Sequence, residues 1–191
     1  MSRRSIIGGS VVMAGISVAA LALAIGFLPE PGPESAARVI DYPGFDVHHP
    51  PEAVPALSFS DADGGAGALS SFEGRVVLVN LWATWCPPCV EDMPALDSLQ
   101  AQLGGGDFEV VALSIDREGA DVVLPFFEAQ GLEHLTVYLD QDADGPRAFR
   151  ARGFPTSIVL DRQGRRIATY EGELAWDAPE VVDMLRRVVE N

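Results

Sequence analysis

Both cysteines of this 191-residue chain lie in one short motif, Trp85-Cys86-Pro87-Pro88-Cys89. Cysteines three positions apart on the first turn of a helix have side chains near enough to close a disulfide. A helix N-terminus offers unpaired amide donors and the positive end of the peptide dipole, and both favour a thiolate over a thiol. We therefore predict a redox-active pair in which exposed Cys86 is the attacking nucleophile and inward-facing Cys89 is the resolving thiol.

A structural disulfide and a metal site are the alternative uses of such a pair. A disulfide that closes so short a loop restrains the unfolded chain little. A zinc site needs four ligands, and beyond the two cysteines the chain has three histidines, two of them adjacent. We therefore predict no metal site.

The motif stands between a predicted strand and a predicted helix. Residues 75–82 and 109–115 are near-continuous apolar runs rich in β-branched residues, typical of strands that are covered on both faces. Between them, from Pro87 to Leu103, apolar residues recur every three or four positions, which predicts a helix. Strand, helix and strand make a βαβ unit, so the cysteines lie at the end of the first strand.

The pattern predicts one α/β domain over residues 53–191. Apolar residues make up 48% of the chain, which suits one domain with a real core. Further strands are expected at residues 57–60, 136–139, 156–160 and 166–170, and further helices at 121–130, 143–150 and 179–189. Asp177 and Glu180 resemble a capping box for the last helix.

The charge balance excludes one class of partner. The chain carries 13 basic and 28 acidic side chains, a formal net charge of −15. A nucleic-acid-binding surface is therefore excluded as an interpretation.

The first 28 residues are predicted to be a signal anchor. Residues 6–28 carry no charge, and a helix of this length can cross a hydrocarbon core of ~30 Å. Arg3 and Arg4 precede this segment, which predicts that the N-terminus lies inside. A cleaved signal with a small-residue site at residues 35–37 and a buried core helix are the alternatives. Residues 2–7 also resemble a twin-arginine export signal. The domain is expected on the periplasmic side of the inner membrane.

Residues 29–52 are predicted to be a linker. The segment is rich in proline and has no periodic apolar pattern, which is typical of an extended tether. His48 and His49 lie here beside Pro50, and we expect them to be solvated rather than to bind a metal.

Residues 77–94, together with Gly153-Phe154-Pro155-Thr156-Ser157, resemble the membrane-anchored periplasmic thioredoxins of bacterial cytochrome assembly, the TlpA, ResA and CcmG group. The likeness is greatest to TlpA, because residues 107–116 and 173–177 are also similar. The resemblance implies a thioredoxin fold with an N-terminal strand extension and a central insertion, here at residues 117–138. It also implies a cysteine pair that works without a cofactor. Peroxidases of this fold place a proline and a threonine where this chain has Val79 and Ala83, so a peroxidase is disfavoured.

The resemblance also implies where a protein substrate binds. Pro155 matches the family's cis-proline, which lies against the disulfide and lets the backbone of the preceding residue pair with substrate as an added strand. Phe154 and Gly153 are therefore expected to be substrate-binding residues. Trp85 and Pro87 flank Cys86 and are expected to contact substrate as well.

Two acidic positions of related proteins differ in this chain. The buried aspartate of cytosolic thioredoxins is replaced by Asn80, so that base is missing. In the family an acid three residues after the second cysteine, usually glutamate, is proposed to move the proton of the buried thiol. This position is Asp92, which is expected to serve as the proton carrier for Cys89, with a solvated first-turn acid as the alternative.

The two prolines between the cysteines favour a reductant. Neither Pro87 nor Pro88 has an N–H to donate, so the Cys86 thiolate should be only moderately stabilised and the pair only weakly oxidising. The resemblance implies a membrane electron donor of the DsbD or CcdA type. It implies, as substrates, copper-site cysteines of cytochrome oxidase and its copper chaperone, or the haem-attachment cysteines of apocytochrome c. A monomer is expected. The alternatives are a thiol oxidase or isomerase, and a copper-binding assembly factor that would need His134.

Overall fold

The computed structural model describes residues 33–191, and the predicted anchor at residues 6–28 lies outside them. Within the described range, no helix is both long and apolar enough to cross a bilayer.

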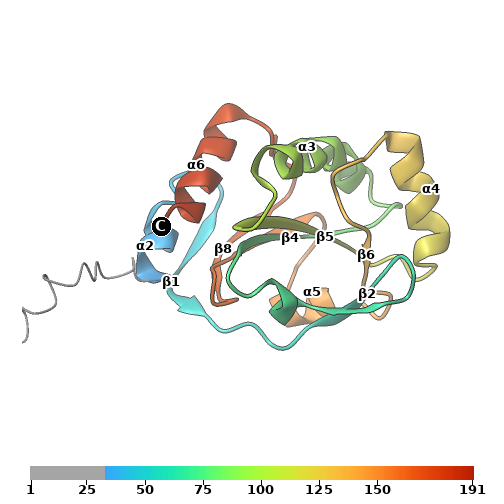
Figure 1. Cartoon of the computed structure of the whole chain (residues 1–191), viewed down its shortest axis with the longest axis horizontal. Helices are drawn as coiled ribbons and strands as arrows, with labels where there is room; N and C mark the ends of the chain where they lie inside the picture. The colour runs from blue at the N-terminus through green and yellow to red at the C-terminus, as the bar shows by residue number, and fades with distance from the viewer. Residues whose placement is uncertain (1–32) are drawn as a thin grey trace, which may run out of the picture. The chain divides into compact units, whose positions relative to one another are not determined.

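An eight-stranded mixed sheet forms the frame of the domain, in the order β1-β8-β7-β4-β5-β6-β2-β3 (Figure 1). At its centre is the predicted βαβ unit of β4 (Val76–Trp82), α3 (Pro87–Leu103) and β5 (Phe108–Ser114). The two strands pair in parallel from Val76 opposite Phe108 to Trp82 opposite Ser114. Every residue of both strands is buried, which explains why their sequences are nearly continuous apolar runs.

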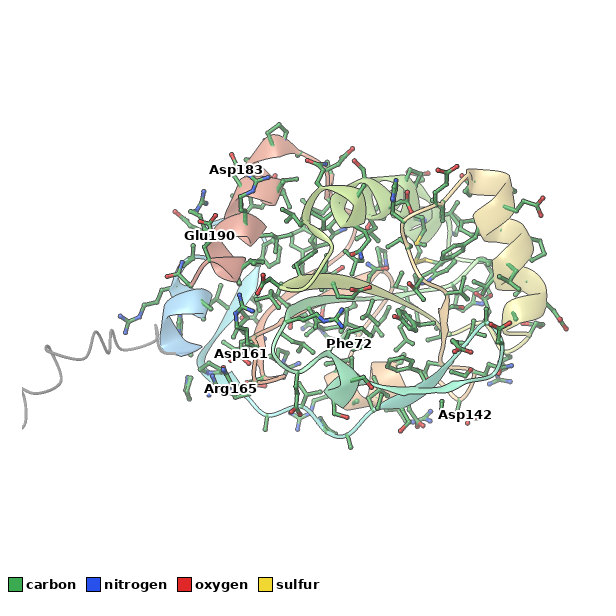
Figure 2. The ribbon with its side chains drawn as sticks, viewed as in Figure 1. Phe72, Asp142, Asp161, Arg165, Asp183 and Glu190 are labelled. Atoms are coloured by element: carbon green, nitrogen blue, oxygen red, sulfur yellow. A yellow bond between two sulfur atoms is a disulfide. The ribbon has the colours of Figure 1, made fainter. Side chains whose placement is uncertain are left out.

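The predicted hairpin consists of β7 (Thr156–Leu160) and β8 (Arg166–Glu171), and β7 pairs antiparallel with β4. Asp161 holds the turn, where its carboxylate accepts hydrogen bonds from the Gln163 and Arg165 amides at 3.0 and 2.9 Å. The Arg165 guanidinium donates to the same carboxylate, and the two side chains lie together at this turn (Figure 2). Leu81 lies opposite Thr156, so β7 begins at the end of the sheet where β4 stops.

The other sheet edge is made of short strands, β6 (Tyr138–Leu139), β2 (Ser58–Asp61) and β3 (Ala66–Ala68), followed by the 3-10 helix η1 (Leu69–Phe72). The strand predicted at residues 136–139 is reduced to two residues. Just before this strand the chain is bound to α3, where the Asp97 carboxylate accepts the amides of His134 and Leu135 at 2.8 and 2.9 Å.

Helices cover both faces of the sheet (Figure 1). One face is covered by α3, α4 (Ala120–Gln130) and α6 (Pro179–Val189), and the other by α5 (Asp144–Phe149). Each face of the sheet has its own hydrophobic core, and alternate residues of β4 point into the two cores. Val76, Leu78 and Trp82 pack on the first face, and Val77, Val79 and Leu81 pack on the second.

The predicted capping box of α6 is wrong. Its N-cap is Ala178, and within the described part of the chain no side chain caps this helix end. The Ala178 carbonyl instead accepts the amides of Val181 and Val182 at 3.0 Å each, and Pro179 has no amide hydrogen to satisfy.

The linker prediction is also wrong from residue 33 onward. Residues 33–38 form α2 (Pro33–Arg38), with Ala37 only 1% exposed, and β1 (Asp46–Glu52) pairs antiparallel with β8. Prolines are tolerated at a sheet edge, where one row of backbone amides needs no partner, and the register of β1 shifts between Val47 and Glu52. The strand was therefore not predicted, because its sequence contains prolines and has no alternation of apolar residues.

Candidate active site

The two cysteines are joined by a disulfide at the start of α3, with their Cα atoms 5.3 Å apart. Cys86 is the N-cap of the helix, and Pro87 and Pro88 are its first two residues. The first helical hydrogen bond runs from the Val90 amide to the Cys86 carbonyl at 3.1 Å. Because neither proline can donate, the helix end offers Cys86 fewer amides than most helix N-termini would.

The two sulfur-bearing residues differ in exposure. Cys86 is 6% exposed, whereas Cys89 is completely buried. Cys89 lies on the inner side of α3, and Cys86 caps the helix beside the loop that follows β4. Both residues are buried, so the expectation of an exposed Cys86 is wrong in degree, and the order of attack stays a prediction.

An aromatic pair flanks the exposed side of the motif. Trp85 is 61% exposed, and within the described residues it is one of two large apolar side chains that are exposed to solvent. Its ring meets that of Phe154 edge to face, with centroids 6.2 Å apart and planes at 87°. Residues 85 and 154, far apart in the sequence, are therefore brought together beside the disulfide.

The Phe154–Pro155 peptide bond is cis, as the resemblance implied. The loop around it is held by two hydrogen bonds, from the Gly172 amide to the Pro155 carbonyl at 3.0 Å and from the Thr156 hydroxyl to the Gly153 carbonyl at 2.7 Å. A Cβ atom at Gly153 would meet none of the described atoms within 4 Å except those of its chain neighbours. The loop thus presents an open backbone surface next to Trp85.

Asp92 lies one turn of α3 after Cys89 and is 4% exposed. Its carboxylate accepts two hydrogen bonds from the loop between β8 and α6, from the Leu174 amide at 3.2 Å and from the Trp176 indole N–H at 3.4 Å. Burial raises the pKa of Asp92 to about 6, against the two hydrogen bonds, which lower it. The alternative of a solvated acid is therefore wrong.

Asn80 is completely buried in β4, where its amide nitrogen donates to the Ser157 hydroxyl at 2.9 Å. Its oxygen has no hydrogen-bond partner among the described residues, a property that it shares with the Trp82 indole nitrogen. A neutral amide thus occupies the position where cytosolic thioredoxins have a buried acid.

Asp116 holds the loop before the cysteines, a role that was not predicted from the sequence. The Asp116 side chain, just after β5 and 1% exposed, accepts hydrogen bonds from the Thr84 amide, the Thr84 hydroxyl and the Ser114 hydroxyl. Its position in the sequence could have indicated this role. Asp116 follows β5, which is parallel to β4, so both strands end at the edge of the sheet where the cysteine motif lies. Trp176 lies in the stretch 173–177 that resembles TlpA, but its contact with Asp92 was not predicted because nothing in the sequence relates residue 176 to residue 92.

Comparison with known proteins agrees with this geometry. The family model described as Redoxin matches residues 50–185, most of the chain. The chain belongs to the Redoxin family. This Redoxin chain is 29% identical, over 120 residues, to the thiol-disulfide oxidoreductase ResA of Bacillus thuringiensis subsp. konkukian; the match covers 63% of the chain and 68% of ResA.

Two solved structures from Chlorobium tepidum have the same fold. A protein proposed to be the thiol:disulfide interchange protein DsbE superposes with a TM-score of 0.65 at 27% identity, covering 75% of this chain and 98% of that one. A thiol:disulfide interchange protein of the thioredoxin family gives a TM-score of 0.59 at 27% identity, covering 73% and 97%.

These matches confirm the thioredoxin-like fold and the resemblance to the TlpA, ResA and CcmG group. This member of the Redoxin family is a thiol:disulfide oxidoreductase, and its redox group is its own Cys86–Cys89 pair. The greater likeness to TlpA stays a prediction.

Proposed function

We propose that the protein is a membrane-tethered periplasmic reductase of protein disulfides, with Cys86 as the nucleophile and Cys89 as the resolving thiol. The observation that carries the proposal is the unequal burial of the two cysteines at the helix N-terminus, 6% against 0%. Cys86 keeps a small exposed surface and Cys89 has none, so we expect a substrate sulfur to meet Cys86 first.

The reaction then proceeds in two exchanges. The Cys86 thiolate attacks one sulfur of a substrate disulfide, forming a mixed disulfide and releasing the other substrate sulfur as a thiolate. The Cys89 thiolate next attacks the Cys86 sulfur, which closes the Cys86–Cys89 disulfide and releases the second substrate thiolate. Two electrons pass to the substrate, and no further oxidant or reductant enters this step.

Cys89 must lose a proton before it can attack, and Asp92 is the proposed acceptor. It lies one helical turn away in the same buried layer, and with a pKa of about 6 it is mostly ionised at neutral pH yet close to accepting a proton. A carboxylate with an ordinary pKa near 4 would hold the proton less well.

The direction of electron flow is inferred from the surroundings of Cys86. Two prolines replace amide donors at the helix end, and the chain as a whole is strongly acidic. Both features disfavour a thiolate, and a less stable thiolate makes the reduced pair a better electron donor. A thiol oxidase or isomerase is the alternative, for which a strongly oxidising pair would be expected.

The proposed substrate surface consists of Trp85, Pro87, Gly153 and Phe154, beside cis-Pro155. The open backbone at Gly153 and the exposed Trp85 ring support the docking of an extended segment along this loop. Copper-site cysteines of cytochrome oxidase or its chaperone are the proposed substrates, with the haem-attachment cysteines of apocytochrome c as the alternative. A membrane protein of the DsbD or CcdA type is the proposed electron donor.

Copper binding by the protein itself is less well supported. His134 is the histidine that this role would need, and its amide is fixed by Asp97, eight residues after Cys89 in α3. Eight helical residues span ~12 Å, so His134 is held beside a different part of the helix from the cysteines.

The proposed location rests on the uncharged segment at residues 6–28 after Arg3 and Arg4. Retention of this segment is supported by α2, because cleavage near residues 35–37 would remove Ala36 and Ala37, both buried in the core. N-terminal sequencing of the membrane-bound protein should find residues that precede Pro33. A mature chain that begins near Arg38 in a soluble fraction would contradict the anchor.

Trapping in the native membrane tests the proposed reaction. Cys89→Ala should accumulate mixed disulfides through Cys86, and mass spectrometry of the trapped species names the substrate. The double variant Cys86→Ala, Cys89→Ala is the control and should trap nothing. Trapping by Cys86→Ala in place of Cys89→Ala would reverse the assigned roles.

A further inference from the structure

The loop at residues 172–178, between β8 and α6, contacts both oxygens of the Asp92 carboxylate. The Leu174 amide donates to Oδ1 at 3.2 Å and the Trp176 indole N–H donates to Oδ2 at 3.4 Å. Trp176 is completely buried, so its N–H has no solvent to bind in place of Asp92. The carboxylate is therefore oriented by a segment that is remote in sequence from the cysteine motif.

Trp176 is itself held by aromatic rings from two other segments. Phe45, just before β1, meets the indole edge to face at 6.2 Å between centroids, and Tyr170 of β8 does so at 6.0 Å. Phe45 and Tyr170 also contact each other at 5.0 Å. The indole cannot turn its N–H away from Asp92 without disturbing this cluster, so the direction of the hydrogen bond is set by packing.

The charged groups around Asp92 make this donor important. Burial disfavours the ionised carboxylate most strongly, and the charges of Glu173 in the loop and Glu91 on α3 disfavour it further. The donors that favour the ionised form are the Leu174 amide and the Trp176 indole. The Leu174 donor is a backbone N–H, which every substitution except proline keeps, so Trp176 is the side-chain donor through which the proton affinity of Asp92 can be changed.

We propose that Trp176 is a positioning residue of the redox reaction, whose indole N–H holds the Asp92 carboxylate ionised and oriented to take the proton of Cys89. This inference rests on the proposed role of Asp92. In this role Trp176 acts through its hydrogen bond to the Asp92 carboxylate.

The test compares two Trp→Phe variants of the full chain. Trp176→Phe removes an N–H that donates to Asp92, whereas Trp82→Phe removes a buried N–H without a partner among the described residues. Both remove similar volume from the same core. The readouts are the Asp92 pKa, from its infrared carboxyl band, and the pH profile of disulfide reduction.

We expect Trp176→Phe to raise the Asp92 pKa by about one pH unit, and to move the acid side of the activity profile upward by the same amount. Trp82→Phe should leave both midpoints at their wild-type positions. Equal midpoints in Trp176→Phe and wild type would overturn the proposal.

A third variant separates the loss of the N–H from the loss of packing volume. Replacement of Trp176 by benzothienylalanine keeps the bicyclic ring and lacks the N–H, so it should reproduce the Trp176→Phe shift. Asp92→Asn separates this inference from the proposed function. If Asp92→Asn leaves the activity profile unchanged, the proton-carrier role of Asp92 fails. The infrared band would still report whether Trp176 sets the pKa of Asp92.

Discussion

Thr84 donates both its backbone N–H and its hydroxyl to the carboxylate of Asp116, at 2.9 and 2.7 Å. The Ser114 hydroxyl donates to the same group at 2.8 Å. One buried side chain at the end of β5 thus fixes the loop that leads from β4 into the cysteine motif. The position of Cys86, two residues after Thr84, depends on this contact.

Loss of Asp116 should therefore destabilise the domain and weaken catalysis together. Asp116→Ala leaves three donors without this acceptor. The Ser114 hydroxyl is buried, and an unsatisfied buried group costs ~1–3 kcal/mol, whereas the two Thr84 donors are partly exposed and can bind water, so we expect a loss of about 2–3 kcal/mol in the free energy of unfolding. Thr84→Val removes one donor and should cost ~1 kcal/mol. Urea unfolding and insulin reduction measure the two effects. A fully active, fully stable Asp116→Ala protein would show that this contact does not position the loop.

The stability of the oxidised protein should depend on pH through Asp92. Burial raises its pKa to about 6, above the ordinary value near 4, so between these values the folded state binds more protons than the unfolded state. Asp92 therefore contributes stability below about pH 4 that is lost as the pH rises through about 6. The full loss is on the order of 3 kcal/mol.

Comparison with Asp92→Asn isolates this contribution, because Glu109 and Asp140 also have pKa values raised by burial. The variant should be the more stable protein at pH 7, and its advantage should disappear near pH 4. Urea midpoints across this range give the difference. A constant difference at all pH values would show that Asp92 keeps an ordinary pKa.

Replacement of Pro88 by histidine should make the pair more oxidising. The variant restores one N–H at the second position of α3 and adds a side chain that can carry positive charge, so the Cys86 thiolate gains stability. For a two-electron couple, ~1.4 kcal/mol corresponds to ~30 mV, so a rise of some tens of millivolts is expected. Equilibration with a glutathione buffer measures it, and thiolate absorbance should show a lower Cys86 pKa. An unchanged potential would show that the missing amide donors do not set the redox potential of the cysteine pair.

Phe45→Ala should destabilise the protein although residue 45 precedes the predicted domain. The ring packs on Tyr170 and Trp176 and is partly buried, so we expect a loss of about 2 kcal/mol. Leu124→Ala is the matched surface control, because Leu124 is 45% exposed, and it should cost less than ~0.5 kcal/mol. If the two variants unfold at the same urea concentration, the N-terminal segment adds nothing to the core.

The sequence predicted the parts of the molecule whose signal is local. The apolar runs of β4 and β5, the helical repeat of α3 and the hairpin turn at Asp161 are each determined by neighbouring residues, and the structure confirms them. The N-terminal segment was misjudged because the stability of β1 comes from its partner β8 and not from its own residues.

The candidate site divides in the same way. Cys86 and Cys89 are recognisable from their spacing, and the cis-Pro155 peptide from its neighbours by resemblance. The burial of Asp92 and its contact with Trp176 depend on how the loop after β8 packs on α3. Contacts of this kind join residues more than eighty positions apart, and no periodicity in the chain encodes them.

The pairing of β1 with β8 also bears on the order in which the chain folds. His48 meets Thr169 across this pair, 121 positions later in the chain, whereas β4, α3 and β5 are consecutive. During synthesis β1 therefore stays unpaired until β8 has emerged, and long-range contacts of this kind form slowly. An unpaired strand is a hazard for aggregation, and prolines reduce that hazard because they lack the amides that a foreign strand would bind. Pro50 and Pro51, because of which β1 was not predicted as a strand, therefore suit a segment that stays unpaired until β8 is available.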